Sequence, residues 1–188
     1  WYGKSHWVYW LLPLSWLFCL IAGVRKFLLV NFLQKTLPVP VIVVGNISVG
    51  GTGKTPLIIE LVKYLQQQGH KPGVVSRGYG GVATYPNLLD QNSQASASGD
   101  EPLLIYRATQ CAVCVAPDRV AAALILIAQG CTHILSDDGL QHYRLGRSLE
   151  IAVVDGQRLF GNQKLLPVGP LREPVSRLKS VDLIVLNS

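Results

Sequence analysis

Three glycines within four residues, followed by a lysine and a threonine, are the part of this chain best suited to binding phosphate. They lie in VIVVGNISVGGTGKTPLIIELVKYL (Val41–Leu65), where a strand-like run passes through a glycine turn into a helical pattern. This arrangement brings backbone N–H groups to one point, where the helix dipole favours negative charge. We therefore expect a phosphate-binding loop between the strand and the helix.

The loop matches the pattern GxxxxGK[ST] except at its first position, which is Ser48. In this pattern Lys54 reaches the β- and γ-phosphates of a nucleotide, and the Thr55 hydroxyl binds Mg²⁺. A dinucleotide site fits less well, because Pro56 stands where its third glycine is needed. We expect ATP, together with Mg²⁺, to bind to the eight residues of this loop: Ser48, Val49, Gly50, Gly51, Thr52, Gly53, Lys54 and Thr55.

Acidic residues suited to the metal follow a second strand-like run, in HILSDDGLQH (133–142). Asp137 and Asp138 are both candidates, and although Asp-Asp-Gly alone is typical of an ordinary turn, the upstream loop favours a site. Asp100 stands at a loop-to-helix junction, where its carboxylate could act as a base or cap the helix. Spacing alone leaves both roles open.

The elements that must position these residues alternate between short apolar runs and helical patterns from residue 38 onward. This alternation predicts an α/β fold in which a mostly parallel sheet is flanked by helices, as in P-loop NTPases. We expect a domain over 38–188 and an N-terminal segment over 1–37. The predicted strands cover 39–44, 73–76, 112–116, 133–136, 151–154 and 183–186, and the predicted helices cover 53–68, from about 101, and 117–129.

The segment between the second strand and Asp100 has no clear period, so we expect residues 78–98 to form a mobile, exposed loop. Arg77, Tyr79 and Tyr85 could contact a substrate there, or could simply face solvent.

Trp7–Val24 contains no charged residue over 18 positions and is followed by Arg25 and Lys26. This length is the lower limit for crossing a bilayer, and the basic pair places that end on the cytoplasmic side. The segment predicts a membrane span or an interfacial anchor, and Pro13 keeps the interfacial alternative open. A signal peptide and a buried helix are the remaining readings.

Composition supports one folded domain, since 49% of the 188 residues are hydrophobic. The net charge of +6 suits phosphate-rich ligands or anionic lipid, whereas no basic run or aromatic signature points to nucleic acid. Cys111 and Cys114 have metal-type spacing but lie in an apolar run, which favours packing. Because the chain begins at Trp1 and ends in a strand-like run, we expect it to be part of a longer protein.

Six ordered motifs give the chain a family resemblance. It resembles the N-terminal half of the tetraacyldisaccharide 4'-kinase family, the lipid A 4'-kinases of Gram-negative bacteria. The motifs are VVGNISVGGTGKTP (43–56), SRGYGG (76–81), GDEP (99–102), PDRVAAA (117–123), SDDGLQH (136–142) and LPVGPLREP (166–174).

The resemblance implies transfer of the ATP γ-phosphate to the 4'-hydroxyl of an acylated glucosamine disaccharide 1-phosphate, at the cytoplasmic face of the inner membrane. It implies that Asp100 activates the hydroxyl, that Lys54 handles the phosphates, and that Asp137 and Asp138 belong to the metal and nucleotide network. The family motifs also place near the site Arg77, Tyr79, Glu101, Gln141, His142, Arg172 and Glu173.

Other nucleotide-binding proteins share parts of this pattern. A membrane-associated switch ATPase of the partition or septum-site type carries a signature lysine where this chain has Val49. A GTPase needs an aspartate where Ser136 stands and a later Asn-Lys-x-Asp, which the sequence lacks. A non-catalytic nucleotide-binding module at the membrane is a third alternative.

Overall fold

A seven-stranded sheet forms the centre of the computed structural model, which describes residue 1 and residues 7–78 and 84–187. Its strands lie in the order β3-β4-β2-β5-β1-β6-β7, and β3 alone is antiparallel to its neighbour in this described sheet. The strands are β1 (Val41–Gly45), β2 (Pro72–Ser76), β3 (Asn87–Leu88), β4 (Ala112–Val115), β5 (His133–Asp137), β6 (Leu149–Asp155) and β7 (Leu183–Asn187). The predicted mostly parallel α/β fold is confirmed.

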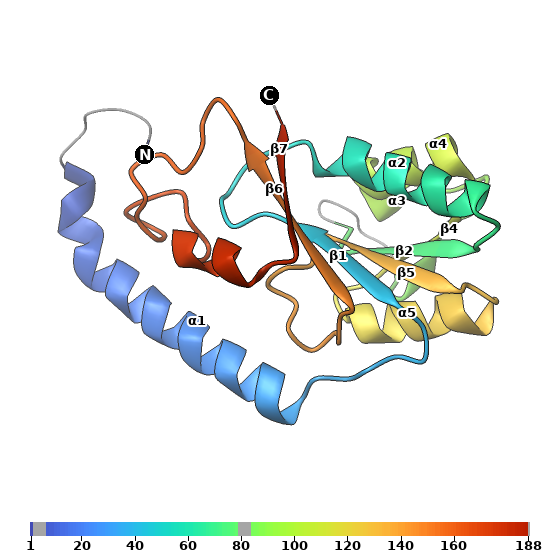
Figure 1. Ribbon diagram of the computed structural model, residues 1–188, viewed down its shortest axis with the longest axis horizontal. Coiled ribbons are helices and arrows are strands. Elements are labelled where there is room, and N and C mark those ends of the chain that lie inside the picture. The colour runs from blue at the N-terminus through green and yellow to red at the C-terminus, as the bar shows by residue number, and fades with distance from the viewer. Residues whose placement is uncertain (2–6, 79–83, 188) are drawn as a thin grey trace.

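Helices cover both faces of the sheet (Figure 1). On one face lie α2 (Lys54–Gln67) and α4 (Asp100–Thr109), and α5 (Arg119–Ala128) lies on the other. Ile58 and Val62 of α2 are fully buried, as expected for residues one turn apart on an apolar stripe. Asp118 caps the start of α5, because its carboxylate accepts hydrogen bonds from the N–H groups of Val120 and Ala121.

Cys111 and Cys114 pack in the two hydrophobic layers of the domain. Cys111 lies in the layer under α2 and α4, whereas Cys114 lies in the layer under α5. Burial raises the pKa of each thiol to about 11, so both are protonated at neutral pH. These observations support the packing interpretation, because the two side chains lie on opposite faces of the sheet.

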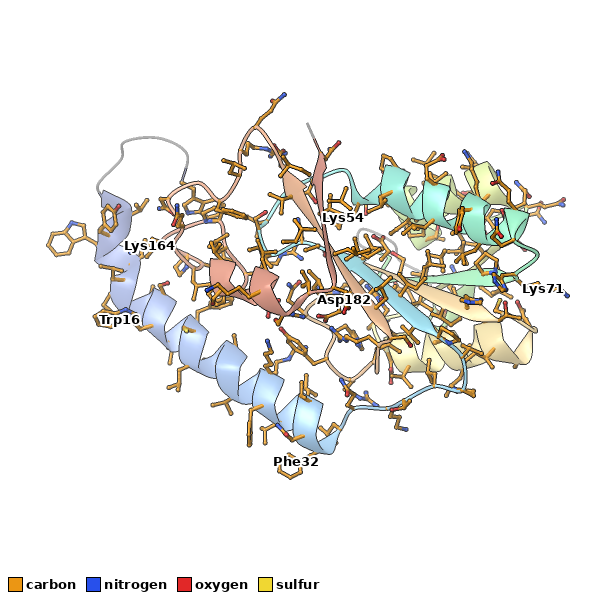
Figure 2. All side chains as sticks on the ribbon, viewed as in Figure 1. Trp16, Phe32, Lys54, Lys71, Lys164 and Asp182 are labelled. Atoms are coloured by element: carbon orange, nitrogen blue, oxygen red, sulfur yellow. The ribbon has the colours of Figure 1, made fainter. Side chains whose placement is uncertain are left out.

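A long helix, α1 (Leu12–Phe32), follows a short 3₁₀ turn, η1 (Trp7–Leu11), and runs along one side of the molecule (Figure 1). Ser15 is its one buried residue within the described chain, and Trp16 and Phe32 project from its outer side (Figure 2). Within residues 8–32, an 18-residue window has a mean hydropathy of 1.6 and is only 6% buried, so by length and composition the helix could cross a membrane.

The helix differs from its prediction in two respects. The helix ends at Phe32, eight residues beyond Val24, and therefore includes the basic residues Arg25 and Lys26. Pro13 stands in its first turn rather than its middle, where a missing N–H costs no intrahelical hydrogen bond. The proline therefore gives no reason to prefer an interfacial position.

The segment expected to be an exposed loop is partly ordered against the sheet. β3 pairs with β4, Leu89 is buried, and a short helix, α3 (Ala95–Ser98), precedes α4. The expectation of an irregular segment was wrong here, because elements of two and four residues are too short to show a period. Tyr79 lies outside the described residues.

Other element boundaries differ slightly. α4 begins at Asp100 rather than Glu101, and a 3₁₀ turn, η2 (Val175–Ser180), precedes β7. Element ends commonly shift by one or two residues, since they depend on local capping.

Gly45, at the end of β1, packs closely against Leu140, and a substitution there tests how tight this packing is. A Cβ there would lie 2.8 Å from Leu140 Cγ and 3.0 Å from the Leu140 backbone nitrogen. We expect Gly45→Ala to cost about 1–3 kcal/mol through overpacking, measured as a fall in melting temperature. Gly51→Ala is the matched control, because nothing lies within 4 Å of its Cβ position. Equal melting temperatures for the two variants would contradict this packing.

Candidate phosphate-transfer site

The glycine loop connects β1 to α2 at the carboxyl edge of the sheet. Gly50 has φ +107° and Gly53 has φ +79°, values that L side chains rarely adopt. A Cβ on Gly53 would also overlap the Asn187 side chain. These conformations let the loop turn its backbone N–H groups towards one point, as a phosphate cradle requires.

Lys54 and Asp138 meet beside this loop, although they are far apart in the sequence. Lys54 Nζ lies 3.6 Å from Asp138 Oδ1, and Arg172 Nη1 lies 2.8 Å from Asp138 Oδ2. Burial alone raises the pKa of Asp138, but the two cations outweigh it and hold this pKa below its usual value. Asp138 is therefore a permanent anion between two cations.

Asp137, the last residue of β5, has the opposite environment. Its side chain is buried, and its Oδ2 accepts a hydrogen bond of 3.1 Å from the Ser76 hydroxyl. Burial, together with the negative charges of Glu101 and Asp138, raises the pKa of Asp137 to about 6. Asp137 Oδ1 has no hydrogen-bond partner among the described residues, so one carboxylate oxygen is available to a ligand.

Hard oxygen atoms suited to Mg²⁺ gather at this edge. The carboxylates of Asp137 and Asp138 and the hydroxyl of Thr55 are ligands of the kind that Mg²⁺ prefers when phosphates and water complete its shell. In the described part of the chain no group of three or more His, Cys, Asp or Glu side chains could hold a metal. The residues thus fit a cation shared with a phosphate rather than a site built from protein ligands alone.

Arg119 is a buried cation that the sequence analysis did not assign to the site. Its Nη1 donates to the Ala116 carbonyl and its Nη2 to the Asp137 carbonyl, each at 3.0 Å. Burial lowers its pKa to about 10, which leaves it charged. In the sequence it lies within the predicted helix 117–129, and nothing in its local pattern marks it as a site residue.

The segment 165–173 supports the loop from the side. Val49 N–H donates to the Pro170 carbonyl at 2.8 Å, and Arg172 N–H donates to the Ile47 carbonyl at 2.7 Å. This backbone pairing places the predicted Arg172 against Asp138, where its guanidinium forms the ion pair described above.

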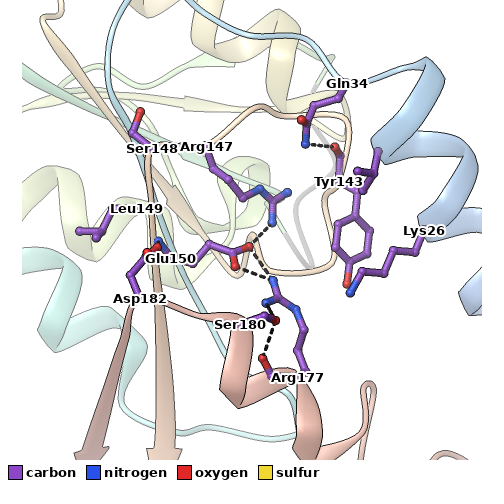
Figure 3. A pocket seen from close by; sticks show the side chains of 11 residues that line it. Lys26, Gln34, Tyr143, Arg147, Ser148, Leu149, Glu150, Arg177, Ser180 and Asp182 are labelled. Atoms are coloured by element: carbon purple, nitrogen blue, oxygen red, sulfur yellow. Dashed lines mark hydrogen bonds and ion pairs between the residues drawn. The ribbon is translucent and has the colours of Figure 1, made fainter.

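Gln141 and Glu173 form a hydrogen-bonded cluster below these residues. Gln141 Nε2 donates to Glu173 Oε2 at 2.9 Å and to the Asn46 carbonyl at 3.0 Å. The Tyr143 hydroxyl also donates to Glu173, and Lys26 of α1 lies 3.6 Å from the same carboxylate. Lys26 and Tyr143 border a shallow pocket of about 390 Å³ between α1 and the sheet (Figure 3). The same pocket contains the Arg147–Glu150–Arg177 ion pairs.

The remaining predicted residues are less tightly connected. Asp100 is exposed at the first position of α4, and no side-chain hydrogen bond caps this helix, whose N-cap is Gly99. Glu101 is exposed beside it, yet its charge contributes to the raised pKa of Asp137. His142 Nε2 lies 3.3 Å from the Pro117 carbonyl, and burial and Arg119 lower the pKa of its imidazole. Arg77 is exposed.

Comparison with known proteins gives a consistent result. The family model described as tetraacyldisaccharide-1-P 4'-kinase matches residues 7–188. A tetraacyldisaccharide 4'-kinase from Hahella chejuensis is 50% identical over 196 residues, covering 100% of this chain and 58% of the relative. One from Aeromonas salmonicida is 54% identical over 191 residues, covering 100% of this chain and 58% of the relative.

A solved structure agrees with these relatives. LpxK from Aquifex aeolicus, determined in complex with ATP, shares 34% identity and a TM-score of 0.83 with this chain. The match covers 96% of this chain and 58% of that one. The chain therefore spans somewhat more than half the length of the relatives that it matches.

The raised pKa of Asp137 gives a test of the site's electrostatics. Because this pKa is higher in the folded than in the unfolded chain, ionised Asp137 costs stability above about pH 6, and the cost disappears as the pH falls towards the ordinary value. We expect Asp137→Asn to raise stability by about 1–3 kcal/mol at neutral pH, measured by melting temperature in a chelator without nucleotide.

The gain should shrink on acidification to about pH 4, where wild-type Asp137 is itself protonated. Asp90→Asn is the control, since Asp90 is an exposed loop carboxylate. A gain for Asp137→Asn that is the same at both pH values would contradict the electrostatic explanation.

Proposed function

The chain belongs to the tetraacyldisaccharide-1-P 4'-kinase family, and we propose that it is the nucleotide-binding part of a kinase that acts in lipid A biosynthesis. The reaction is transfer of the ATP γ-phosphate to the 4'-hydroxyl of a tetraacyl glucosamine disaccharide 1-phosphate. The observation that carries the proposal is the meeting of the glycine loop, Lys54, Asp138 and Arg172 at one edge of the sheet.

The loop residues 48–55 would bind the phosphates of ATP. Their conformation turns N–H groups to one side, and Lys54, whose side chain is only 11% exposed, supplies a positive charge beside them. In phosphoryl transfer the transition state is loose, so orientation and charge neutralisation carry most of the catalysis. Arg172 and Arg119 add two further cations near the same carboxylates.

Mg²⁺ would be held by Thr55 and by Asp137 or Asp138, where it would neutralise phosphate charge. The unpartnered Oδ1 atom of Asp137 and the oxygen-rich surroundings support this role. Ser76 fixes the orientation of the Asp137 carboxylate through its hydrogen bond, and Arg119 anchors the backbone of the same residue.

Asp100 would orient the sugar hydroxyl and accept its proton. It is exposed at the start of α4, where it does not cap the helix, and its neighbour Glu101 is close enough to influence Asp137 electrostatically. These observations support the base role over the capping role that the sequence left open.

The exposed apolar helix α1 would hold the enzyme at the inner membrane, with the site on the cytoplasmic face. Large side chains such as Trp10, 88% exposed, and Trp16, 70% exposed, are suited to lipid rather than water. The net charge of +6 agrees with a substrate that already carries a phosphate.

The proposal is tested by following labelled γ-phosphate from ATP into a tetraacyl disaccharide 1-phosphate in detergent micelles, with the full-length protein. Lys54→Ala should lower transfer by roughly 10²- to 10³-fold, since a cation aimed at the phosphates is lost. Lys63→Ala is the matched control, because Lys63 is an exposed residue of the same helix whose partner is Glu60. Hydrolysis of ATP without labelled lipid would favour the switch ATPase instead.

The Asp100→Asn variant shows, in the same assay, whether Asp100 acts as a base or as a structural residue. If Asp100 accepts the hydroxyl proton, its loss should lower kcat by roughly 10²- to 10⁴-fold and leave the Kd for ATP unchanged. Asp90→Asn again serves as an exposed control. A parallel loss of ATP affinity would show that Asp100 supports the fold of the site rather than the reaction.

A further inference from the structure

Three consecutive carbonyl groups of the glycine loop accept hydrogen bonds from side chains. Each of these side chains lies at or just after the end of a different strand. The Gly50 carbonyl accepts from Asn46 Nδ2 at 3.3 Å, directly after β1. The Gly51 carbonyl accepts from Arg158 Nη2 at 2.6 Å, just after β6. The Thr52 carbonyl accepts from Asn187 Nδ2 at 3.3 Å, at the end of β7.

Holding these carbonyls determines where the loop's N–H groups point. In a planar trans peptide the C=O of one residue and the N–H of the next point in opposite directions. Fixing the carbonyls of residues 50–52 therefore turns the N–H groups of residues 51–53 to the other side of the loop. Within the described residues these N–H groups donate to no protein acceptor, so they are available to a phosphate.

Arg158 makes the strongest of the three contacts, because it is a charged donor at the shortest distance. It is itself held in place by Asp155, the last residue of β6. Asp155 Oδ2 accepts from Arg158 Nε at 2.7 Å, and Asp155 Oδ1 accepts from the Arg158 backbone N–H at 2.9 Å. Arg158 Nη2, which donates to the Gly51 carbonyl, also lies 2.6 Å from Asp155 Oδ2. Because Nη2 carries two N–H groups in a planar guanidinium, it can bind Asp155 and the loop at the same time.

Asn187 is placed by the same pair of strands. Its backbone pairs in register with Asp155, and its carbonyl accepts from the Gly156 N–H at 2.7 Å. Its side chain also occupies the space where a residue larger than glycine at position 53 would need its Cβ. The ends of β6 and β7 thus form one support beneath the middle of the loop.

We propose that Arg158, anchored by Asp155, and Asn187 are positioning residues that hold the glycine loop in the conformation that receives the β-phosphate. This inference rests on one part of the proposed function, the binding of ATP by the loop. Because both ADP and ATP carry a β-phosphate in this cradle, the two residues affect the two nucleotides equally. Because both residues act on the loop, we expect their substitution to leave the KM for the lipid unchanged.

The experiment measures the Kd of Mg–ADP and Mg–ATP by titration calorimetry with the full-length protein and its Arg158→Gln, Arg158→Lys and Asn187→Ala variants. Arg107→Gln is the matched control, since Arg107 is exposed in the last turn of α4 and its side chain has no partner among the described residues. We expect Arg158→Gln to weaken both nucleotides by about ten-fold or more, as loss of a charge-assisted hydrogen bond predicts.

Arg158→Lys should recover only part of this affinity, because a lysine cannot bind Asp155 and the Gly51 carbonyl with two nitrogens at once. Asn187→Ala should weaken both nucleotides by a smaller, equal factor. The melting temperature of the nucleotide-free Arg158→Gln protein should match that of Arg107→Gln, which separates positioning from general stability.

Two results would overturn the proposal. Unchanged affinity for both nucleotides in Arg158→Gln would show that the loop keeps its shape unaided. A loss restricted to ATP would show that Arg158 contacts the γ-phosphate instead of holding the loop. Nucleotide binding by the wild-type protein without transfer to lipid would reject the proposed kinase function but leave this inference standing.

Discussion

The parallel pairing of β1 with β5 is the constraint on which the rest of the site depends. It places Val44, just before the glycine loop, opposite Asp137, which lies 93 residues later in the chain. A slip of one residue would turn Asp137 to the other face of the sheet and separate it from the loop. The register is held because both strands are buried on both faces, where alternate side chains fill two different hydrophobic layers.

Around this pairing the charges are arranged so that two adjacent carboxylates behave differently. Asp138 lies between Lys54 and Arg172, which keep its pKa low, whereas Asp137 is buried beside other carboxylates and has a raised pKa. Such separation is common where neighbouring acids serve different roles. One aspartate holds two cations in place, and the other offers an oxygen atom to a ligand.

The long helix α1 is attached to the same segments that support the site. Ser15 donates to the Leu165 carbonyl at 3.1 Å, and Lys26 lies over the Tyr143 ring (Figure 3). Lys26 Nζ also lies 3.6 Å from Glu173 Oε1. Glu173 in turn binds Gln141, which donates to the Asn46 carbonyl at the start of the loop. Few contacts join α1 to the body, but they end on the residues that surround the glycine loop.

The sequence by itself determined the local features. Gly-Lys-Thr after a strand-like run predicted the loop, the alternation of runs predicted the sheet, and the uncharged stretch after Trp7 predicted the apolar helix, because each is set by neighbouring residues. Only the tertiary structure decided which distant groups meet. Arg119 is a buried cation, Arg158 and Asn187 hold the loop, and Asp100 does not cap its helix. These facts depend on strand order and register, which bring together residues whose separation along the chain contains no local signal.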